Sequence, residues 1–270
     1  MTVAKIKAVA REIRKHVIEM AYNAGGAHIG CSLSVVDVLA CLYFNTLNIK
    51  PKLPHWKERD YFILSKGHAC SALYATLAER GFFSPALLKR YMKNGSPIAG
   101  HVTLDSLPGI EATTGSLGHG LSLGTGIALS LKNDNKNSKV YVLVGDGEME
   151  EGSVWEAVMF GGHNKINRLI LIIDNNDLQI IGKSTAIMHS HPFEEKLESF
   201  GWKTVSINGH NINEIIDACK QTGREKPLAI IAKTIKGKGI SFMENKLEWH
   251  GKSLTRDDYE KAIGELNKIP

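Results

Sequence analysis

Two polar clusters in the sequence each follow a run of five apolar residues. The first is Gly-Asp-Gly at 145–147 and the second is Asp-Asn-Asn at 174–176, so Asn176 stands 30 residues beyond Asp146. That spacing suits one strand–helix–strand unit with parallel strands. Ligands of open parallel sheets bind outside the carboxyl ends of the strands. We therefore expect the two clusters to face one common site.

The chemistry of these clusters favours a divalent cation and a diphosphate. The carboxylate of Asp146 and the amide oxygen of Asn176 are hard ligands, and Mg²⁺ is typically held by few protein oxygens together with phosphate and water. Gly145 and Gly147 allow the backbone to approach a diphosphate, and Gly147 can offer an unobstructed N–H. Gly-Asp-Gly alone is also a common turn or helix cap. The second cluster, at the distance of a strand–helix–strand unit, weighs against that simpler interpretation.

Four of the eleven histidines lie beside glycine or in glycine-bearing loops, namely His28, His68, His101 and His250. Imidazole titrates near neutral pH, so these side chains can remove and return hydroxyl protons. The other seven are assigned structural or surface roles: His16, His55, His119, His163, His189, His191 and His210. Among these, the assignment of His119 stays open, because its loop is expected to approach the site.

Other charged residues near the motifs have more than one interpretation. Glu148 and Glu150 are interpreted as solvated charges or as acids at a helix start, where the dipole favours them. Lys233, Lys236 and Lys238 either contact phosphate groups or form a solvated basic edge.

The elements that must position these residues follow from hydrophobic periodicity. Continuous apolar strands indicate a parallel sheet that is covered on both faces. The pattern predicts strands at 61–64, 140–144, 169–173, 204–207 and 228–232, and helices at 3–24, 34–47, 71–80, 121–131, 153–163, 212–220 and 255–267. The stretch 94–120 is a long loop, which inside a compact domain is usually functional. The expected fold is a doubly wound α/β domain spanning 1–270, with a mainly parallel sheet and helices on both faces.

Composition limits the classes of partner and location. The chain has 270 residues, 43% hydrophobic and 23% charged, which is typical of a folded α/β protein. A net charge of +5 with no nucleic-acid-binding motif suits phosphorylated small molecules and predicts no nucleic-acid partner. The four cysteines form no CxxC pair, which favours a reducing cytoplasm. No signal peptide and no apolar run of membrane-spanning length is evident, so no membrane association is expected.

Several segments together resemble one known family. They are GGAHIG around His28, SKGHACSALY at 65–74, AGHVTLDSLPGIEATTGSLGHGLSLGTGIALS at 99–130, GDGEMEEGSVWEA at 145–157, IIDNNDLQIIG at 172–182, TIKGKGISF at 234–242 and the pair His250-Gly251. In this order, and over nearly the whole chain, they resemble the N-terminal, thiamin diphosphate-binding half of transketolase. A Rossmann-type dinucleotide site is not expected, because the glycine-rich patch at 115–120 does not open a first strand–helix–strand unit.

The resemblance implies a metal and cofactor site. Asp146, the Asn176 side chain and the main-chain carbonyl of Leu178 would bind Mg²⁺, or Ca²⁺ or Mn²⁺ in its place. The Gly147 N–H would contact the diphosphate of thiamin diphosphate, beside Gly145.

The resemblance also implies roles for the histidines in moving a two-carbon ketol unit from a ketose phosphate to an aldose phosphate. His68 and His250 match histidines near the diphosphate and the reacting centre, so they serve both catalysis and cofactor binding. His28 and His101 match histidines that hydrogen-bond the sugar near its carbonyl and first hydroxyl groups.

Four further residues match positions at the cofactor ring and at a subunit boundary. Gly115 and Leu117 match the segment that touches the aminopyrimidine and the thiazolium. Glu151 and Glu156 match acids in a hydrogen-bonded network at the subunit interface, which connects to the catalytic site.

The partner is also implied by the resemblance. Full-length transketolases continue with a pyrimidine-binding domain that supplies the activating glutamate, and this sequence stops at Pro270. We therefore expect a separate C-terminal transketolase subunit, in a heterotetramer with two copies of each chain. The alternatives are a 1-deoxyxylulose-5-phosphate synthase-like enzyme, the α subunit of a 2-oxo acid dehydrogenase, or a non-catalytic cofactor-binding module. The His28 and His68 pair, together with GHVTLDSLPG, favours ketose chemistry over 2-oxo acid decarboxylation.

Overall fold

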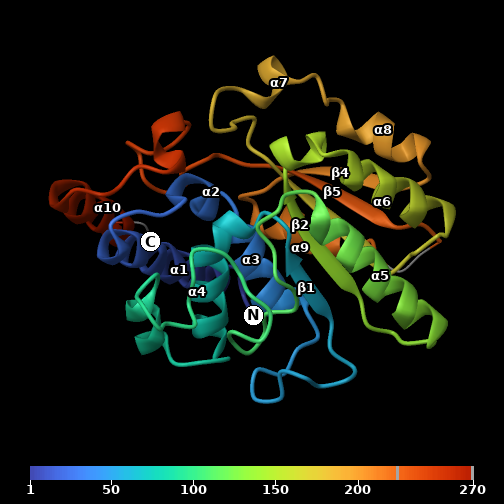
Figure 1. Ribbon diagram of the computed structural model, residues 1–270, viewed down its shortest axis with the longest axis horizontal. Coiled ribbons are helices and arrows are strands. Elements are labelled where there is room, and N and C mark those ends of the chain that lie inside the picture. The colour runs from blue at the N-terminus through green and yellow to red at the C-terminus, as the bar shows by residue number, and fades with distance from the viewer. Residues whose placement is uncertain (223–224, 269–270) are drawn as a thin grey trace.

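A five-stranded parallel sheet forms the centre of the protein in the computed structural model, which describes residues 1–222 and 225–268 (Figure 1). Its strands are β1 (Tyr61–Leu64), β2 (Val140–Gly145), β3 (Leu169–Asn175), β4 (Lys203–Asn208) and β5 (Leu228–Lys233). Their order across the sheet is β1-β2-β3-β5-β4, and every neighbouring pair is parallel. The carboxyl ends of all five strands therefore lie along one edge of the sheet. The predicted doubly wound α/β fold is confirmed.

Helices cover both faces of this sheet (Figure 1). One buried cluster joins alternate residues of β2 and β3 to the helices of the N-terminal part, to α9 and to α10; the other joins the intervening residues to α5, α6 and α8. The helices are α1 (Val3–Ala24), α2 (Ile29–Leu33), α3 (Val36–Cys41), α4 (Cys70–Arg80), α5 (His119–Asn133), α6 (Gly152–His163), α7 (Ser184–Ile187), α8 (Phe193–Ser199), α9 (Ile212–Cys219) and α10 (Arg256–Lys268). Short 3₁₀ or π segments are η1 (Leu42–Thr46), η2 (Gly67–Ala69), η3 (Pro85–Arg90), η4 (Gly147–Glu150) and η5 (Leu247–His250).

Most predicted elements agree with the structure within two residues, and the differences are local. The predicted helix at 34–47 begins earlier, at Ile29, and consists of α2, α3 and the π segment η1. β3 continues through Asn175, because residues 170–175 all pair with β5. The short helices α7 and α8 were not predicted. No α-helix or strand lies between Arg90 and His119, so the long predicted loop is confirmed.

Close packing of α5 sets the position of the loop that precedes it. A Cβ on Gly124 would lie 2.4 Å from Cγ2 of Val142, so only glycine lets α5 lie this close to β2. A Cβ on Gly120 would likewise lie 2.5 Å from the Cβ of Ser65. These two glycines bring the start of α5 against the carboxyl ends of β1 and β2.

One described segment, Ile29–Thr46, is long and apolar enough to cross a membrane by length and composition. The expectation that no run approaches this length was therefore wrong. Of this 18-residue window, 83% is buried inside the protein, so core packing accounts for its apolar character.

Candidate active site

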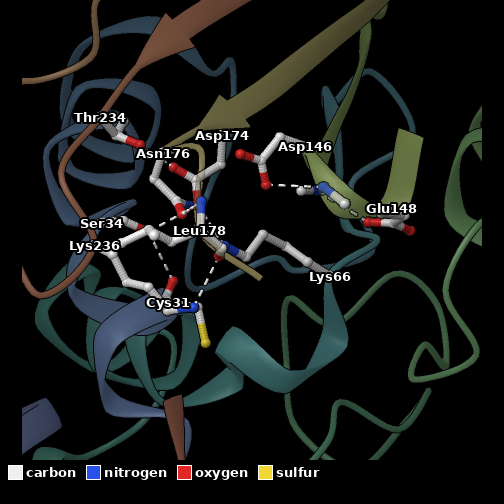
Figure 2. Close-up of polar contacts among 12 residues, drawn as sticks. Cys31, Ser34, Lys66, Asp146, Glu148, Asp174, Asn176, Leu178, Thr234 and Lys236 are labelled. Atoms are coloured by element: carbon white, nitrogen blue, oxygen red, sulfur yellow. Dashed lines mark hydrogen bonds and ion pairs between the residues drawn. The ribbon is translucent and has the colours of Figure 1, made fainter. Parts of the chain in front are cut away.

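Asp174 is the centre of a buried hydrogen-bond network at the end of β3 (Figure 2). Its Oδ2 accepts from Lys66 Nζ at 2.5 Å, from Ser34 Oγ at 2.7 Å and from Asn176 Nδ2 at 3.0 Å, and its Oδ1 accepts from the Thr234 hydroxyl. Burial alone would raise the pKa of Asp174, but the Lys66 ammonium outweighs it and holds that pKa below its usual range. The network thus fixes four segments around one charged carboxylate.

Asp146 lies at the end of β2, next to this network, and its carboxylate is buried. Its Oδ1 accepts from the N–H of Gly147 at 2.8 Å, and its Oδ2 accepts from the N–H of Asp177 at 2.6 Å. Burial, together with the nearby charge of Asp174, raises the pKa of Asp146 to about 6. The Gly147 N–H expected to be free is therefore engaged with Asp146 in this structure. A buried carboxylate in this setting is well suited to a cation.

The side chain of Asn176 has a defined orientation. Its Nδ2 donates to Asp174, and its Oδ1 accepts from the N–H of Leu178 at 3.1 Å. Figure 2 shows the side chains of Asp146 and Asn176 at neighbouring strand ends, on the same side of the sheet edge. Two hard oxygen donors are thus present where the sequence predicted a divalent cation.

The carbonyl of Leu178, the third expected metal ligand, accepts a hydrogen bond from Lys236 Nζ at 2.9 Å. The same ammonium lies 3.3 Å from the carbonyl of Gln179 and 3.0 Å from Nδ1 of His250. Lys236 is buried, so a solvated basic edge is the wrong interpretation for this residue. Burial lowers its pKa, and the charge of Lys66 adds to this effect.

The four histidines that the sequence singled out form one cluster. The ring centroid of His28 lies 5.3 Å from those of His68 and His250 and 5.9 Å from that of His101; the His68 and His250 centroids are 5.7 Å apart. Burial, followed by neighbouring cations, lowers the pKa of His68 to about 2 and that of His250 to about 3, and also lowers the pKa of His28. These three rings are neutral at physiological pH and can accept protons or hydrogen bonds.

The loop before α5 is fixed against the end of β1. Thr114 Oγ1 donates to the carbonyl of Leu64 at 2.6 Å. Gly115 has φ +155°, and a Cβ there would lie 3.2 Å from the ring of His101. Leu117 is half-buried, and its carbonyl lies 3.2 Å from Nδ1 of the exposed His119. Gly115 and Leu117 therefore lie beside the histidine cluster, and their contact with a cofactor ring stays a prediction.

Glu148 is buried, and its interpretation as a solvated or helix-start charge was wrong. Its carboxylate accepts from the hydroxyl of Ser65, from the N–H of Gly118 at 2.9 Å and from the N–H of Gly145 at 3.1 Å. Burial raises its pKa. Glu148 therefore connects the end of β1, the loop before α5 and the end of β2 at the side of the site.

The remaining acids after Gly147 lie outside the histidine cluster. Glu150 is half-buried and accepts from Gln179 Nε2 at 2.6 Å. Glu151 and Glu156 are exposed, at the N-cap of α6 and within it. Their predicted place in a network at a subunit interface is untested by a single chain.

Sequence reasoning missed the residues that support the site. Lys66 and Asp174 form its central ion pair, and Glu148 holds three loops together. Two signals were present in the sequence: Lys66 follows a strand within SKGH, and Asp174 opens the Asp-Asn-Asn cluster. Their pairing across 108 residues has no local signal.

Comparison with known proteins identifies the family. The model described as "Transketolase, thiamine diphosphate binding domain" matches residues 5–266. The chain belongs to the transketolase family. It corresponds to the thiamine diphosphate-binding part of that family, so the resemblance seen in the sequence is confirmed.

The similar proteins fall into two groups by length. The chain is 43% identical to the 6-deoxy-6-sulfo-D-fructose transketolase subunit SqwG of Clostridium sp. (strain MSTE9), covering 96% of this chain and 95% of that protein. It is 40% identical to an apulose-4-phosphate transketolase subunit from Phocaeicola vulgatus, covering 99% and 96%. It also matches the crystal structure of transketolase from Campylobacter jejuni with a TM-score of 0.93 and 31% identity, covering 99% of this chain but only 43% of that one. The chain thus spans less than half of that solved transketolase and nearly all of these relatives named as subunits.

These matches favour transketolase over the alternative thiamin diphosphate enzymes. The donors at the strand ends also fit the cofactor class, because Asp146, the oxygen of Asn176 and the carbonyl of Leu178 are hard ligands next to glycine backbone.

Proposed function

We propose that this chain is the N-terminal subunit of a two-subunit transketolase, which moves a two-carbon ketol unit from a ketose phosphate to an aldose phosphate. The observation that carries the proposal is the cluster of His28, His68, His101 and His250, next to the hard oxygen donors at the ends of β2 and β3. Support also comes from relatives of the same length that are named as transketolase subunits.

Residues at the strand ends would hold the metal and the diphosphate. Asp146, Asn176 and the Leu178 carbonyl would bind Mg²⁺, or Ca²⁺ or Mn²⁺. The buried ammonium groups of Lys66 and Lys236 add positive charge where a diphosphate would lie. Thiamin diphosphate, when bound, supplies the carbon nucleophile and the electron sink for breaking a bond beside a carbonyl.

The histidines would handle the protons of the sugar. Because burial keeps His28, His68 and His250 neutral, each has one nitrogen that donates and one that accepts. His28 and the exposed His101 would hydrogen-bond the carbonyl and first hydroxyl groups, while His68 and His250 face the reacting centre. A positioned acid or base of this kind contributes about 10²–10⁴-fold to the rate.

A partner chain would complete the site, in a cytoplasmic heterotetramer with two copies of each chain. The names of the relatives, which describe them as subunits, support this part of the proposal, and so do the four cysteines, which are all free. The two relatives named above differ in their sugars, a sulfonated ketose and a ketose phosphate. We therefore take the substrate class to be small ketoses with an anionic terminal group, with sugar phosphates as the main expectation.

The experiment is to isolate the partner and measure ketol transfer. A tagged chain is expressed in its native cell, the co-purified protein is identified, and the complex is assayed with a panel of ketose and aldose phosphates plus a sulfonated ketose. Transfer that requires both chains, Mg²⁺ and thiamin diphosphate is the expected result. Transfer by this chain alone would contradict the split enzyme. A complex that binds cofactor but has no activity on the whole panel would favour the non-catalytic module.

A further inference from the structure

A second group of metal-binding side chains lies beside the expected magnesium site. Cys31, His68 and His250 each offer one ligand atom, and these three atoms lie within 4.8 Å of one another. They come from three separate segments, α2, η2 and η5. We propose that they form a binding site for a borderline or soft divalent ion such as Zn²⁺, distinct from the site of Asp146 and Asn176.

The donor set separates the two sites chemically. Thiolate and imidazole are the ligands that Zn²⁺ prefers, whereas carboxylate and carbonyl oxygens suit Mg²⁺. His68 and His250 have lowered pKa values because they are buried, so their lone pairs are not protonated at neutral pH. His28, whose ring centroid is 5.3 Å from both of the other rings, can provide a fourth ligand; otherwise water takes that position.

The geometry requires only a small contraction. Two ligand atoms bound to one tetrahedral Zn²⁺ at about 2.0–2.3 Å are about 3.5 Å apart, so the cluster must close by about 1 Å. His68 and His250 are only partly buried and can rotate by this amount. Cys31 is fixed on the buried helix α2, with its Sγ donating to the carbonyl of His28 at 3.4 Å. Metal binding replaces that weak hydrogen bond.

Charges near the cluster make binding selective rather than impossible. Lys66 is neutralised by Asp174 at 2.5 Å. Lys236 lies between the two cation sites, 3.0 Å from Nδ1 of His250 and 2.9 Å from the Leu178 carbonyl (Figure 2). An ion that uses Nδ1 of His250 must displace this ammonium. A weakly coordinating ion cannot offset that loss, but an ion that forms a thiolate bond can.

Proton balance gives the site a further property. Burial raises the pKa of Cys31, so the free group is a thiol. Binding converts the S–H bond into a sulfur–metal bond and releases one proton to solvent, with no change of oxidation state. If the proposed function is right, an ion on His68 and His250 would also exclude the cofactor and sugar. That consequence rests on the proposed function, whereas the site itself does not.

Cobalt provides the test, because Co²⁺ occupies zinc sites and its bond to thiolate gives a near-ultraviolet charge-transfer band. The full chain, free of cofactor, is titrated with Co²⁺ and then with Zn²⁺ or Mg²⁺. We expect a thiolate band that Zn²⁺ removes and Mg²⁺ does not. Cys31→Ser should lose the band and at least about 100-fold of the Zn²⁺ affinity, more than the 10–100-fold that loss of an outer supporting residue costs. Cys41→Ser is the matched control, since Cys41 is also a buried free thiol but lies against the carbonyl of Ile212.

The absence of a thiolate band in the wild-type chain would overturn the proposal, and so would an unchanged band in Cys31→Ser. Circular dichroism establishes that the serine variant is folded. If it is not, X-ray absorption of the zinc-loaded wild type decides the question. One sulfur at about 2.3 Å with two nitrogen ligands supports the site, and a shell of oxygen and nitrogen alone refutes it.

Discussion

Asp146 combines burial with a lack of charged hydrogen-bond partners. Among residues 1–222 and 225–268, its carboxylate accepts hydrogen bonds only from the backbone N–H groups of Gly147 and Asp177. Asp174, one strand away, has an ammonium group, two hydroxyl groups and an amide as donors. The two aspartates therefore have different tasks: Asp174 organises the protein, and Asp146 is left to bind a cation from outside.

Replacing Asp146 by alanine tests the metal role directly. We expect Asp146→Ala to remove magnesium-dependent binding of thiamin diphosphate, with a loss of more than about tenfold in affinity, or ~1.4 kcal/mol. Isothermal titration calorimetry with and without Mg²⁺ measures the effect, and circular dichroism verifies the fold. Asp134→Ala, at an exposed carboxylate after α5, should bind like the wild type. Unchanged affinity in Asp146→Ala would remove this residue from the site.

At the scale of elements, a buried ion pair supports the segment that carries Lys236. Arg14 of α1 donates to Asp37 of α3 at 2.6 Å, and its Nε donates to the carbonyl of Lys238 at 3.1 Å. His210 lies with Nδ1 2.8 Å from Asp37 and accepts from the N–H of Ile235 at Nε2. Because Nε2 is an acceptor, Nδ1 carries the hydrogen and donates it to Asp37. Two helices thus hold the backbone on both sides of Lys236.

This pair predicts a pH-dependent contribution to stability. Burial opposes ionisation of Asp37, but Arg14 and His210 outweigh it and hold its pKa well below the usual range. A lowered pKa gives stability that is present above the unfolded value of about 3.9 and is lost as the pH falls through the folded value. Asp37→Asn should therefore cost about 3–5 kcal/mol near pH 7 and progressively less below about pH 4.

Urea unfolding of wild type and Asp37→Asn across this pH range measures the difference. Asp217→Asn is the control, because its pair with Lys220 is exposed and should be worth under about 1 kcal/mol. A cost for Asp37→Asn that stays constant with pH, or one as small as that of the control, would contradict the assignment.

The elements also show what the sequence could and could not predict. Apolar runs located all five strands, and glycine-rich turns located the strand ends, so Asp146, Asn176 and the four histidines were found. The pairing of Lys66 with Asp174 and the burial of Glu148 depend on which strand ends are neighbours. The early start of the helix at Ile29 was missed because its N-cap, His28, makes no side-chain capping bond. Tertiary packing, rather than a local signal, sets these features.

At the scale of the whole molecule, the outer side of α5 continues from the site. An open groove of about 850 Å³ is lined by Gly115, His119 and the exposed residues of α5, including Leu123. Figure 1 shows α5 on the opposite side of the sheet from α1 and α4. A partner that contacts the cofactor segment at Gly115 would therefore also cover Leu123, whose side chain is 46% exposed in the single chain.

Placing a charge at Leu123 tests whether the partner chain covers this groove. In Leu123→Glu a carboxylate would be buried against the partner without a counter-charge, so we expect assembly to weaken by more than about tenfold. Analytical ultracentrifugation of the mixed chains measures it. Leu53→Glu, at an equally exposed leucine in the loop before β1, should assemble normally. Cofactor-free Leu123→Glu should remain folded, because the new charge faces solvent in the single chain. Normal assembly of Leu123→Glu would place the partner elsewhere, and the site at Gly115 would then have to be completed from another side.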